Sequence, residues 1–200
     1  MLLVATTNLG KIIELGELLA DAEVEVLGLE DIPQGKQKPP EEHGLTFREN
    51  AVAKASCWRQ RTGLATVADD SGLVVDILDG EPGIHSARYA GATASDADNN
   101  NYLLNKLDGM PAENRKAAFH CCLALCRPGR EPVTFEGRAE GVILDTPRGG
   151  MGFGYDPLFY YPPLGKTFAQ LDPAEKNRVS HRAVALRKFL DWLEHHSLSD

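Results

Sequence analysis

The sequence predicts an α/β fold built on a mixed sheet, and two patterns lead to this prediction. Short apolar runs typical of buried strands alternate along the chain with stretches in which apolar residues recur every three or four positions, as on one helix face. Two longer apolar segments, 117–125 and 133–144, flank Pro128 and Gly129 and predict a long hairpin. Hairpin strands are antiparallel, so we expect the sheet to be mixed rather than purely parallel.

The first 30 residues predict a strand, a helix and a second strand. Residues 2–5 form a short apolar run, and residues 6–10 form a polar loop. A helical stripe follows at Ile12, Leu15, Leu18, Leu19 and Ala22. Val24 and Val26 then alternate with Glu23 and Glu25, as in a half-buried strand.

A second helix is predicted after the polar, proline-bearing loop 31–44. Thr46 and Glu49 have the spacing of a capping box, and Gly63 is a suitable helix end. Residues 64–68 and 73–78 predict two strands, with the acidic turn Asp69-Asp70-Ser71-Gly72 between them.

The remaining chain predicts loops and two further helical regions. Residues 80–91 read as a loop, and Ser95 is expected to cap a helix that reaches about Leu107. The glycine-rich run 149–154 suits neither a helix nor a strand. Asp172 with Pro173 predicts a helix start, and a second helix after Ser180 carries the stripe Ala183, Leu186, Leu190 and Leu193.

Length and composition predict one domain, 1–200, or one domain with two lobes, because 42% of its 200 residues are hydrophobic. The apolar run at the N-terminus is too short for a signal or membrane helix, so we expect a cytoplasmic protein. The four cysteines contain no C-x-x-C pair and are expected to be reduced, mostly buried thiols.

The formal net charge of −8 argues against a surface for nucleic acid polymers, whose protein partners are strongly positive. A small anion is not excluded. Surface charges are screened beyond about 8 Å, whereas a phosphate about 4 Å from one lysine or arginine gains on the order of 4 kcal/mol at an effective dielectric near 20.

A candidate phosphate site lies where the first strand meets the first helix. It consists of Thr6, Thr7, Asn8, Leu9, Gly10 and Lys11. Free backbone amides and the positive end of a helix favour an anion there, and Lys11 adds a full charge. An ordinary strand-to-helix turn with a solvated lysine is the alternative.

The acidic pair Asp69 and Asp70 is a candidate for Mg²⁺, which prefers carboxylate oxygens and completes its shell with water and substrate phosphates. In an extended chain the two side chains alternate, so only one of them would face a site. Glu41 or Glu42 is a candidate for a further ligand. A turn and a solvated acidic loop are the alternatives.

Aromatic and basic residues near the C-terminal half suit a nucleotide. Phe153 and Tyr155 lie on a glycine-rich backbone that allows stacking on a base, although a core-packed turn fits the same pattern. Lys176, His181 and Arg182 cluster around a helix start, with solvated surface residues as the alternative.

These motifs together closely resemble the inosine/xanthosine triphosphate pyrophosphatase family, the Ham1-like enzymes. The resemblance spans nearly the whole chain. The matching residues are Ala5-Thr6-x-Asn8-x-Gly10-Lys11, Glu41-Glu42-x-Gly44-x-Thr46-Phe47-x-Glu49-Asn50-Ala51, Ala68-Asp69-Asp70-Ser71-Gly72-Leu73, Pro82-Gly83-Ile84, Ser86-Ala87-Arg88-Tyr89, Gly152-Phe153-Gly154-Tyr155-Asp156-Pro157, Glu175-Lys176 and Ser180-His181-Arg182.

The resemblance implies an elongated mixed sheet flanked by helices, two lobes around a central active-site cleft, and a homodimer. It also implies Mg²⁺-dependent hydrolysis of ITP, dITP and XTP to the monophosphate and pyrophosphate, which clears deaminated purines from the nucleotide pool.

The resemblance also assigns roles to residues. Residues 6–11 and Lys176 would hold the triphosphate, Glu42 and Asp70 would serve Mg²⁺, and Asp70 would accept the proton of the attacking water. The nucleotide pocket would be shaped by Ser71, Phe153, Gly154, Tyr155, Asp156, His181 and Arg182, the last two near the base. The choice of Glu42 over Glu41, and of Asp70 over Asp69, comes from motif register alone.

Two departures from the family pattern are Thr7, where glycine or serine is frequent, and His85, where an aromatic residue is common. Neither removes a charged group. A related pyrophosphatase for modified pyrimidine triphosphates and a nucleotide sensor without turnover are the competing functions. Discrimination against ATP would follow if a donor faces the purine 6-oxo group, since an unpaired donor costs about 1–3 kcal/mol.

Overall fold

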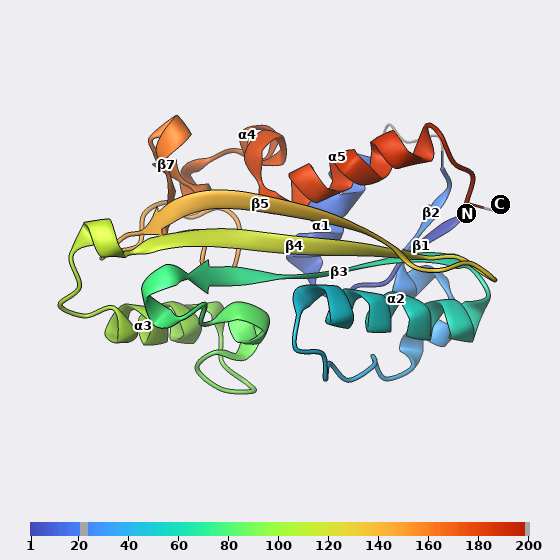
Figure 1. Cartoon of the computed structure of the whole chain (residues 1–200), viewed down its shortest axis with the longest axis horizontal. Coiled ribbons are helices and arrows are strands. Elements are labelled where there is room, and N and C mark those ends of the chain that lie inside the picture. Colours follow the sequence, from blue (N-terminus) through green and yellow to red (C-terminus); the bar gives the residue numbers. More distant parts are fainter. Residues whose placement is uncertain (21–23, 199–200) are drawn as a thin grey trace. The chain divides into compact units, whose positions relative to one another are not determined.

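The structure is a computed structural model that describes residues 1–20 and 24–198. Within these ranges the chain forms seven strands and five α-helices (Figure 1). In chain order they are β1 (Leu2–Val4), α1 (Leu9–Leu19), β2 (Val26–Leu27), α2 (Phe47–Thr62), β3 (Ala65–Val75), α3 (Asp96–Lys106), β4 (Lys116–Cys126), β5 (Val133–Ile143), β6 (Phe159–Tyr161), β7 (Lys166–Thr167), α4 (Pro173–Val179) and α5 (His181–Leu193).

The described strands form one sheet in the order β2-β1-β3-β4-β5-β6-β7. Strand β1 pairs in parallel with β2 and β3, whereas β6 pairs antiparallel with β5 and β7. The neighbouring strands β4 and β5 are joined by only the short segment 127–132, which allows a hairpin but not a parallel crossover. The predicted mixed α/β fold is therefore confirmed.

The chain divides into two compact units. Unit 1 comprises Met1–Asp70, Cys121–Gly137 and Arg182–Asp200, and unit 2 comprises Ser71–His120 and Arg138–His181. The long strands β3, β4 and β5 each contribute residues to both units. The prediction of a single domain over 1–200 stays a prediction.

Unit 1 packs helices against both faces of its strands. Leu2 and Val4 join a core cluster with residues of α1 and α5, while Leu3 and Ala5 join a second cluster with residues of α2. Successive side chains of a strand point to opposite faces, so the apolar run of β1 supplies both cores. Figure 1 shows α2 and α5 on opposite sides of these strands.

Unit 2 has one large cluster. Leu73 and Val75 of β3 pack there with Leu103 of α3 and with the aromatic residues Phe119, Phe159 and Phe168. Asp96 begins α3 after the N-cap Ser95, whose side chain accepts a hydrogen bond from the Asp98 amide. This capping confirms the helix start predicted at Ser95.

The structure corrects the prediction around the acidic pair. Asp69, Asp70, Ser71 and Gly72 do not form a turn between two strands but lie within the continuous strand β3. The short strands β6 and β7 were not predicted. The predicted helical position Ala22 and strand position Glu23 lie outside the described residues.

None of the helices found in residues 1–20 and 24–198 has the length and apolar character that crossing a membrane requires.

Candidate functional site

The predicted phosphate loop of unit 1 is a capped strand-to-helix turn. Asn8 is the N-cap of α1, and its Oδ1 accepts a hydrogen bond from the Lys11 amide at 3.1 Å. Thr6 Oγ1 accepts from the Asn8 amide at 3.2 Å. Thr7, Asn8 and Leu9 are exposed, so the positive end of this helix is open to a ligand from solvent.

Asp69 lies on one face of β3 among buried charges. Its Oδ2 is 2.8 Å from Lys11 Nζ and 3.5 Å from Arg182 Nε, and Arg182 also donates to Glu14. Burial raises the pKa of Asp69, but Lys11 and Arg182 outweigh it and hold the pKa well below its usual range. Asp69 is therefore ionised.

Asp70 points to the opposite face, towards α2. Its Oδ2 accepts a hydrogen bond from Asn50 Nδ2 at 3.1 Å, and its Oδ1 lies 3.4 Å from Lys54 Nζ. The Lys54 ammonium also lies 2.8 Å from Glu42 Oε1 and donates to the Asp69 carbonyl oxygen at 2.9 Å. The alternation expected of neighbouring carboxylates is present, and Glu42 and Asp70 meet at one cation.

The charges around Lys54 shift the pKa values of their neighbours. Burial raises the pKa of Asp70, and the opposing effect of Lys54 does not cancel it. Burial lowers the pKa of Lys54, but the negative charges of Asp70, Asp69 and Glu42 together raise it by more. The pKa of Lys54 therefore lies above its usual value. Lys54 is therefore a permanent cation between two carboxylates.

The structure separates the two glutamates that motif register had to choose between. Glu41 pairs with Lys38 at 2.8 Å and with His43 at 3.2 Å, and its side chain is 61% exposed. Glu42 instead reaches Lys54 and thus the neighbourhood of Asp70. This geometry favours Glu42 as the residue that acts with Asp70.

The donor set around Lys54 fits a hard divalent cation. Glu42 and Asp70 already converge on a positive charge, and a magnesium site usually needs only one or two carboxylates besides water and phosphate. The described residues hold no cluster of three or more His, Cys, Asp or Glu side chains placed for a metal. A divalent cation held by Glu42 and Asp70 would complete its shell with water and other oxygen ligands.

A second group of predicted residues lies in unit 2. Lys176 Nζ is 2.5 Å from Asp156 Oδ2 and 5.0 Å from the centre of the Phe153 ring. Asp156 Oδ2 also accepts from the Phe153 amide at 2.9 Å. Both Lys176 and Asp156 are buried, whereas Phe153 is half-buried.

The two aromatic residues of the glycine-rich segment differ in environment. Tyr155 is buried, and its hydroxyl donates to the Ser86 carbonyl at 2.8 Å, so its ring belongs to the core. His181 is also buried and stacks on Phe119 at 4.7 Å between ring centres. Ser71 is half-buried on β3. Phe153 is therefore the aromatic residue of this segment best placed to contact a ligand.

The sequence analysis assigned no role to Glu14, Asn50 or Lys54, although Asn50 stands in one of the matching motifs. Asn50 and Lys54 are four residues apart on α2 and therefore share a helix side, next to the buried stripe that contains Ala51 and Ala55. Two polar residues four positions apart, beside an apolar helical stripe, are the sequence feature that could have pointed to Asn50 and Lys54. Glu14 directly precedes the buried Leu15 on α1 and gave no comparable signal.

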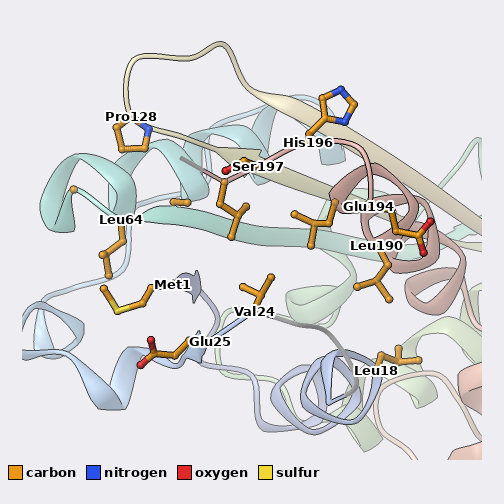
Figure 2. A pocket seen from close by; sticks show the side chains of 14 residues that line it. Met1, Leu18, Val24, Glu25, Leu64, Pro128, Leu190, Glu194, His196 and Ser197 are labelled. Atoms are coloured by element: carbon orange, nitrogen blue, oxygen red, sulfur yellow. The ribbon is translucent and has the colours of Figure 1, made fainter. Parts of the chain in front are cut away.

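A hollow of about 970 Å³ in unit 1 has a different character (Figure 2). Figure 2 shows Leu18, Val24, Leu64 and Leu190 arranged around it. The side chains that line it include Glu25 and Glu194 but, among the described residues, no lysine or arginine. Apolar walls and two carboxylates do not suit a triphosphate, and none of the predicted site residues lines this hollow.

Comparison with known proteins finds relatives that match nearly the whole chain. A dITP/XTP pyrophosphatase of Geobacter sulfurreducens is 52% identical over 192 residues, which cover 96% of each chain. The structure of the Staphylococcus aureus Ham1 protein superimposes with a TM-score of 0.87 at 40% identity, covering 98% of this chain and 99% of that one. A HAM1 protein from Coxiella burnetii gives a TM-score of 0.88 at 40% identity, with 98% of both chains covered.

The sequence model of the Ham1 family matches residues 2–192, which include every residue of the charged groups around Lys11 and Lys54 and of the group around Lys176. With this match and these relatives, the chain belongs to the Ham1 family.

Proposed function

We propose that this protein hydrolyses the non-canonical purine nucleoside triphosphates dITP, ITP and XTP to the monophosphate and pyrophosphate, and so removes deaminated purines from the nucleotide pool. The main observation in support of the proposal is that Glu42 and Asp70 both form ion pairs with Lys54. Asp69, which precedes Asp70 on β3, forms an ion pair with Lys11 of the phosphate loop. The 52% identity to a dITP/XTP pyrophosphatase supports the same reaction.

In this proposal residues Thr6, Thr7, Asn8, Leu9, Gly10 and Lys11 hold phosphate oxygens. The amides at the start of α1 donate to them, and the helix dipole adds to the attraction. Lys11 is ion-paired with Asp69, which keeps its ammonium at one place before substrate arrives. Phosphoryl transfer requires mainly positioning and charge neutralisation, which such a loop provides.

Asp70 is proposed as the acceptor of the proton from the attacking water. Its raised pKa makes it a stronger base than an ordinary carboxylate, and Asn50 fixes one of its oxygens. Glu42 and Asp70 would hold Mg²⁺, which supplies charge neutralisation for the phosphates when bound. Lys54 would offset part of the negative charge of both carboxylates.

Lys176 is proposed to hold the triphosphate with the phosphate loop, and the nucleotide pocket is proposed to involve Ser71, Phe153, Gly154, Tyr155, Asp156, His181 and Arg182. Within unit 2, the Phe153 ring would stack on the base while Asp156 and Lys176 fix its position. Arg182 is buried between Glu14 and Asp69, so we expect it to act on Asp69 as well as on base selection.

We further propose that the protein is cytoplasmic and that it forms a homodimer. Sedimentation velocity would test the homodimer by its mass.

The test is a product assay with Mg²⁺ and ITP, XTP, dITP, ATP and GTP in separate reactions. Pyrophosphate should form from the first three, with little from ATP or GTP, and Asp70→Asn should lower kcat by at least about 100-fold. Asp76→Asn makes the same chemical change at an exposed position just beyond β3 and serves as the matched control.

Two outcomes would overturn the proposal. Orthophosphate as the direct product would show cleavage at a different bond. Tight ITP binding without turnover, measured by calorimetry, would identify a sensor rather than an enzyme.

A further inference from the structure

Two side chains of α3 hold the backbone of the glycine-rich segment in unit 2. Asp96 Oδ2 accepts a hydrogen bond from the Gly154 amide at 2.6 Å, and Asn100 Nδ2 donates to the Gly154 carbonyl oxygen at 2.8 Å. Asp96 and Asn100 are four residues apart, so both project from the same side of the helix.

These contacts fix the peptide groups next to Phe153. The Asp96 contact holds the peptide between Phe153 and Gly154, and the Asn100 contact holds the next one. The peptide before Phe153 is held by Asp156 Oδ2, which accepts from the Phe153 amide at 2.9 Å. Three consecutive peptide groups thus each have a side-chain partner.

Gly154 itself would not keep this conformation. It has a φ of +59°, and a Cβ built on it would meet nothing within 4 Å. Glycine visits many conformations at little cost, so contacts from other residues must hold this one. Asp96 and Asn100 supply such contacts at Gly154 itself, beside the contact of Asp156 with the Phe153 amide.

Asn100 is poorly explained as a stabilising helix residue. Asparagine is a weak helix former, and the buried Asn100 Oδ1 has no hydrogen-bond partner among the described residues. Its Nδ2 divides between the Asp96 carbonyl of its own helix, at 2.8 Å, and Gly154. Such a local disadvantage is common where a residue serves a site.

We propose that Asp96 and Asn100 are positioning residues that set the orientation of the Phe153 ring and thereby the selectivity for the purine base. The inference rests on the proposed function, because it requires Phe153 to contact the base. The half-buried Phe153 ring faces Lys176 from one fixed backbone geometry. A loose backbone would let the ring leave that position and weaken the preference for a 6-oxo purine.

The test compares Asp96→Ala and Asn100→Leu with Asp96→Asn, which keeps an acceptor oxygen for the Gly154 amide. The first two variants should lower the ratio of kcat/KM for ITP to that for ATP by about tenfold, mainly through a higher KM for ITP, because a shift of a contact group alters binding geometry. Asp96→Asn should recover most of the ratio.

Hydrogen exchange of the Gly154 amide gives a readout independent of activity. It should exchange at least about tenfold faster in Asp96→Ala than in the unsubstituted protein, since its acceptor is lost. Asn101→Leu changes an exposed neighbour on α3, and Asp98→Ala removes the capping carboxylate that pairs with Ser95. Neither control should change the exchange rate of the Gly154 amide or the ratio of kcat/KM for ITP to that for ATP.

The outcomes separate the two proposals. If the unsubstituted protein shows no preference for ITP, the proposed function fails and base positioning fails with it. If it prefers ITP but both α3 variants keep the full ratio, only the positioning role is overturned. Unchanged exchange at Gly154 in Asp96→Ala would likewise overturn it.

Discussion

Arg182 and Glu14 form a buried ion pair between residues separated by 168 positions in the sequence. The Arg182 side chain is nearly inaccessible, and its Nε also lies 3.5 Å from Asp69 Oδ2. Asp69 in turn pairs with Lys11. Glu14 thus balances part of the positive charge of Arg182, and Asp69 on β3 balances a further part.

Replacing one partner of this pair should destabilise unit 1 strongly. Glu14→Leu leaves a buried guanidinium with one carboxylate fewer, and Arg182→Met leaves Glu14 buried without its cation. Each should cost about 3–5 kcal/mol, because an uncompensated buried charge is expensive. The double variant Glu14→Leu/Arg182→Met should lose less than the sum of the two.

Urea unfolding of the four proteins measures this coupling. Glu17→Leu, at an exposed position on the same helix, is the matched control and should change the free energy of unfolding by less than about 0.5 kcal/mol. Strict additivity of the two buried substitutions would contradict the assignment of a coupled pair.

Acid should remove stability that Asp69 contributes. Burial raises its pKa, but Lys11 and Arg182 bring it well below the usual value, so the folded state binds the proton less tightly than the unfolded chain. The contribution is therefore fully present above pH about 4, the range of an unfolded aspartate, and is lost as the pH falls below it.

The measurement is the free energy of unfolding between pH 5 and pH 2.5 for the unsubstituted protein and Asp69→Asn. One group contributes a slope of at most about 1.4 kcal/mol per pH unit, and the variant should lack that part of the acid loss. Parallel curves for the two proteins would show that Asp69 does not retain its charge on acidification.

Fold prediction succeeded where the controlling interactions are local. The capped starts at Thr46, Ser95 and Asp172 are encoded within three residues, and each is present with its side-chain hydrogen bond. The hairpin formed by β4 and β5 was likewise visible from two long apolar runs around one turn.

The continuous path of β3 could not be predicted from its own residues. Asp69-Asp70-Ser71-Gly72 has the composition of a turn, and two buried carboxylates are costly in a strand. Lys11, Lys54 and Arg182 offset that cost, and they come from three different helices. Such compensation by distant residues leaves no local pattern, so the charge partners of the site appear only in the folded chain.

Thiol reactivity should distinguish Cys57 from the three cysteines of β4. Cys57 is half-buried on α2, whereas Cys121, Cys122 and Cys126 are buried. Burial raises the pKa of Cys122 to about 12, and the pKa values of Cys121 and Cys126 are also raised by burial. The thiolate is the reactive form, so these three should react little at neutral pH.

Alkylation of the folded protein at pH 8, followed by peptide mass analysis, should modify Cys57 first. At pH 9, with a pKa of about 12, Cys122 would still carry only about one thiolate in a thousand molecules. All four cysteines should react equally in urea. Early modification of Cys122 in the folded protein would contradict its burial.

Gly152 should be irreplaceable for a reason that Gly150, two positions earlier, does not share. At Gly152 φ is +76°, and a Cβ would lie 2.1 Å from Asp156 Oδ2. Asp156 cannot yield easily, since the same oxygen binds Lys176 and the Phe153 amide. A Cβ at Gly150 would meet nothing within 4 Å. Gly152→Ala should therefore cost at least about 2 kcal/mol through backbone strain and displacement of a buried ion pair, with Gly150→Ala near neutral.

Thermal unfolding measures the stability of both variants, and ITP turnover should fall only in Gly152→Ala if Asp156 and Lys176 fix the nucleotide. Equal stability and turnover in the two variants would show that the Asp156 carboxylate is free to move, and would remove the argument for a fixed pocket around Phe153.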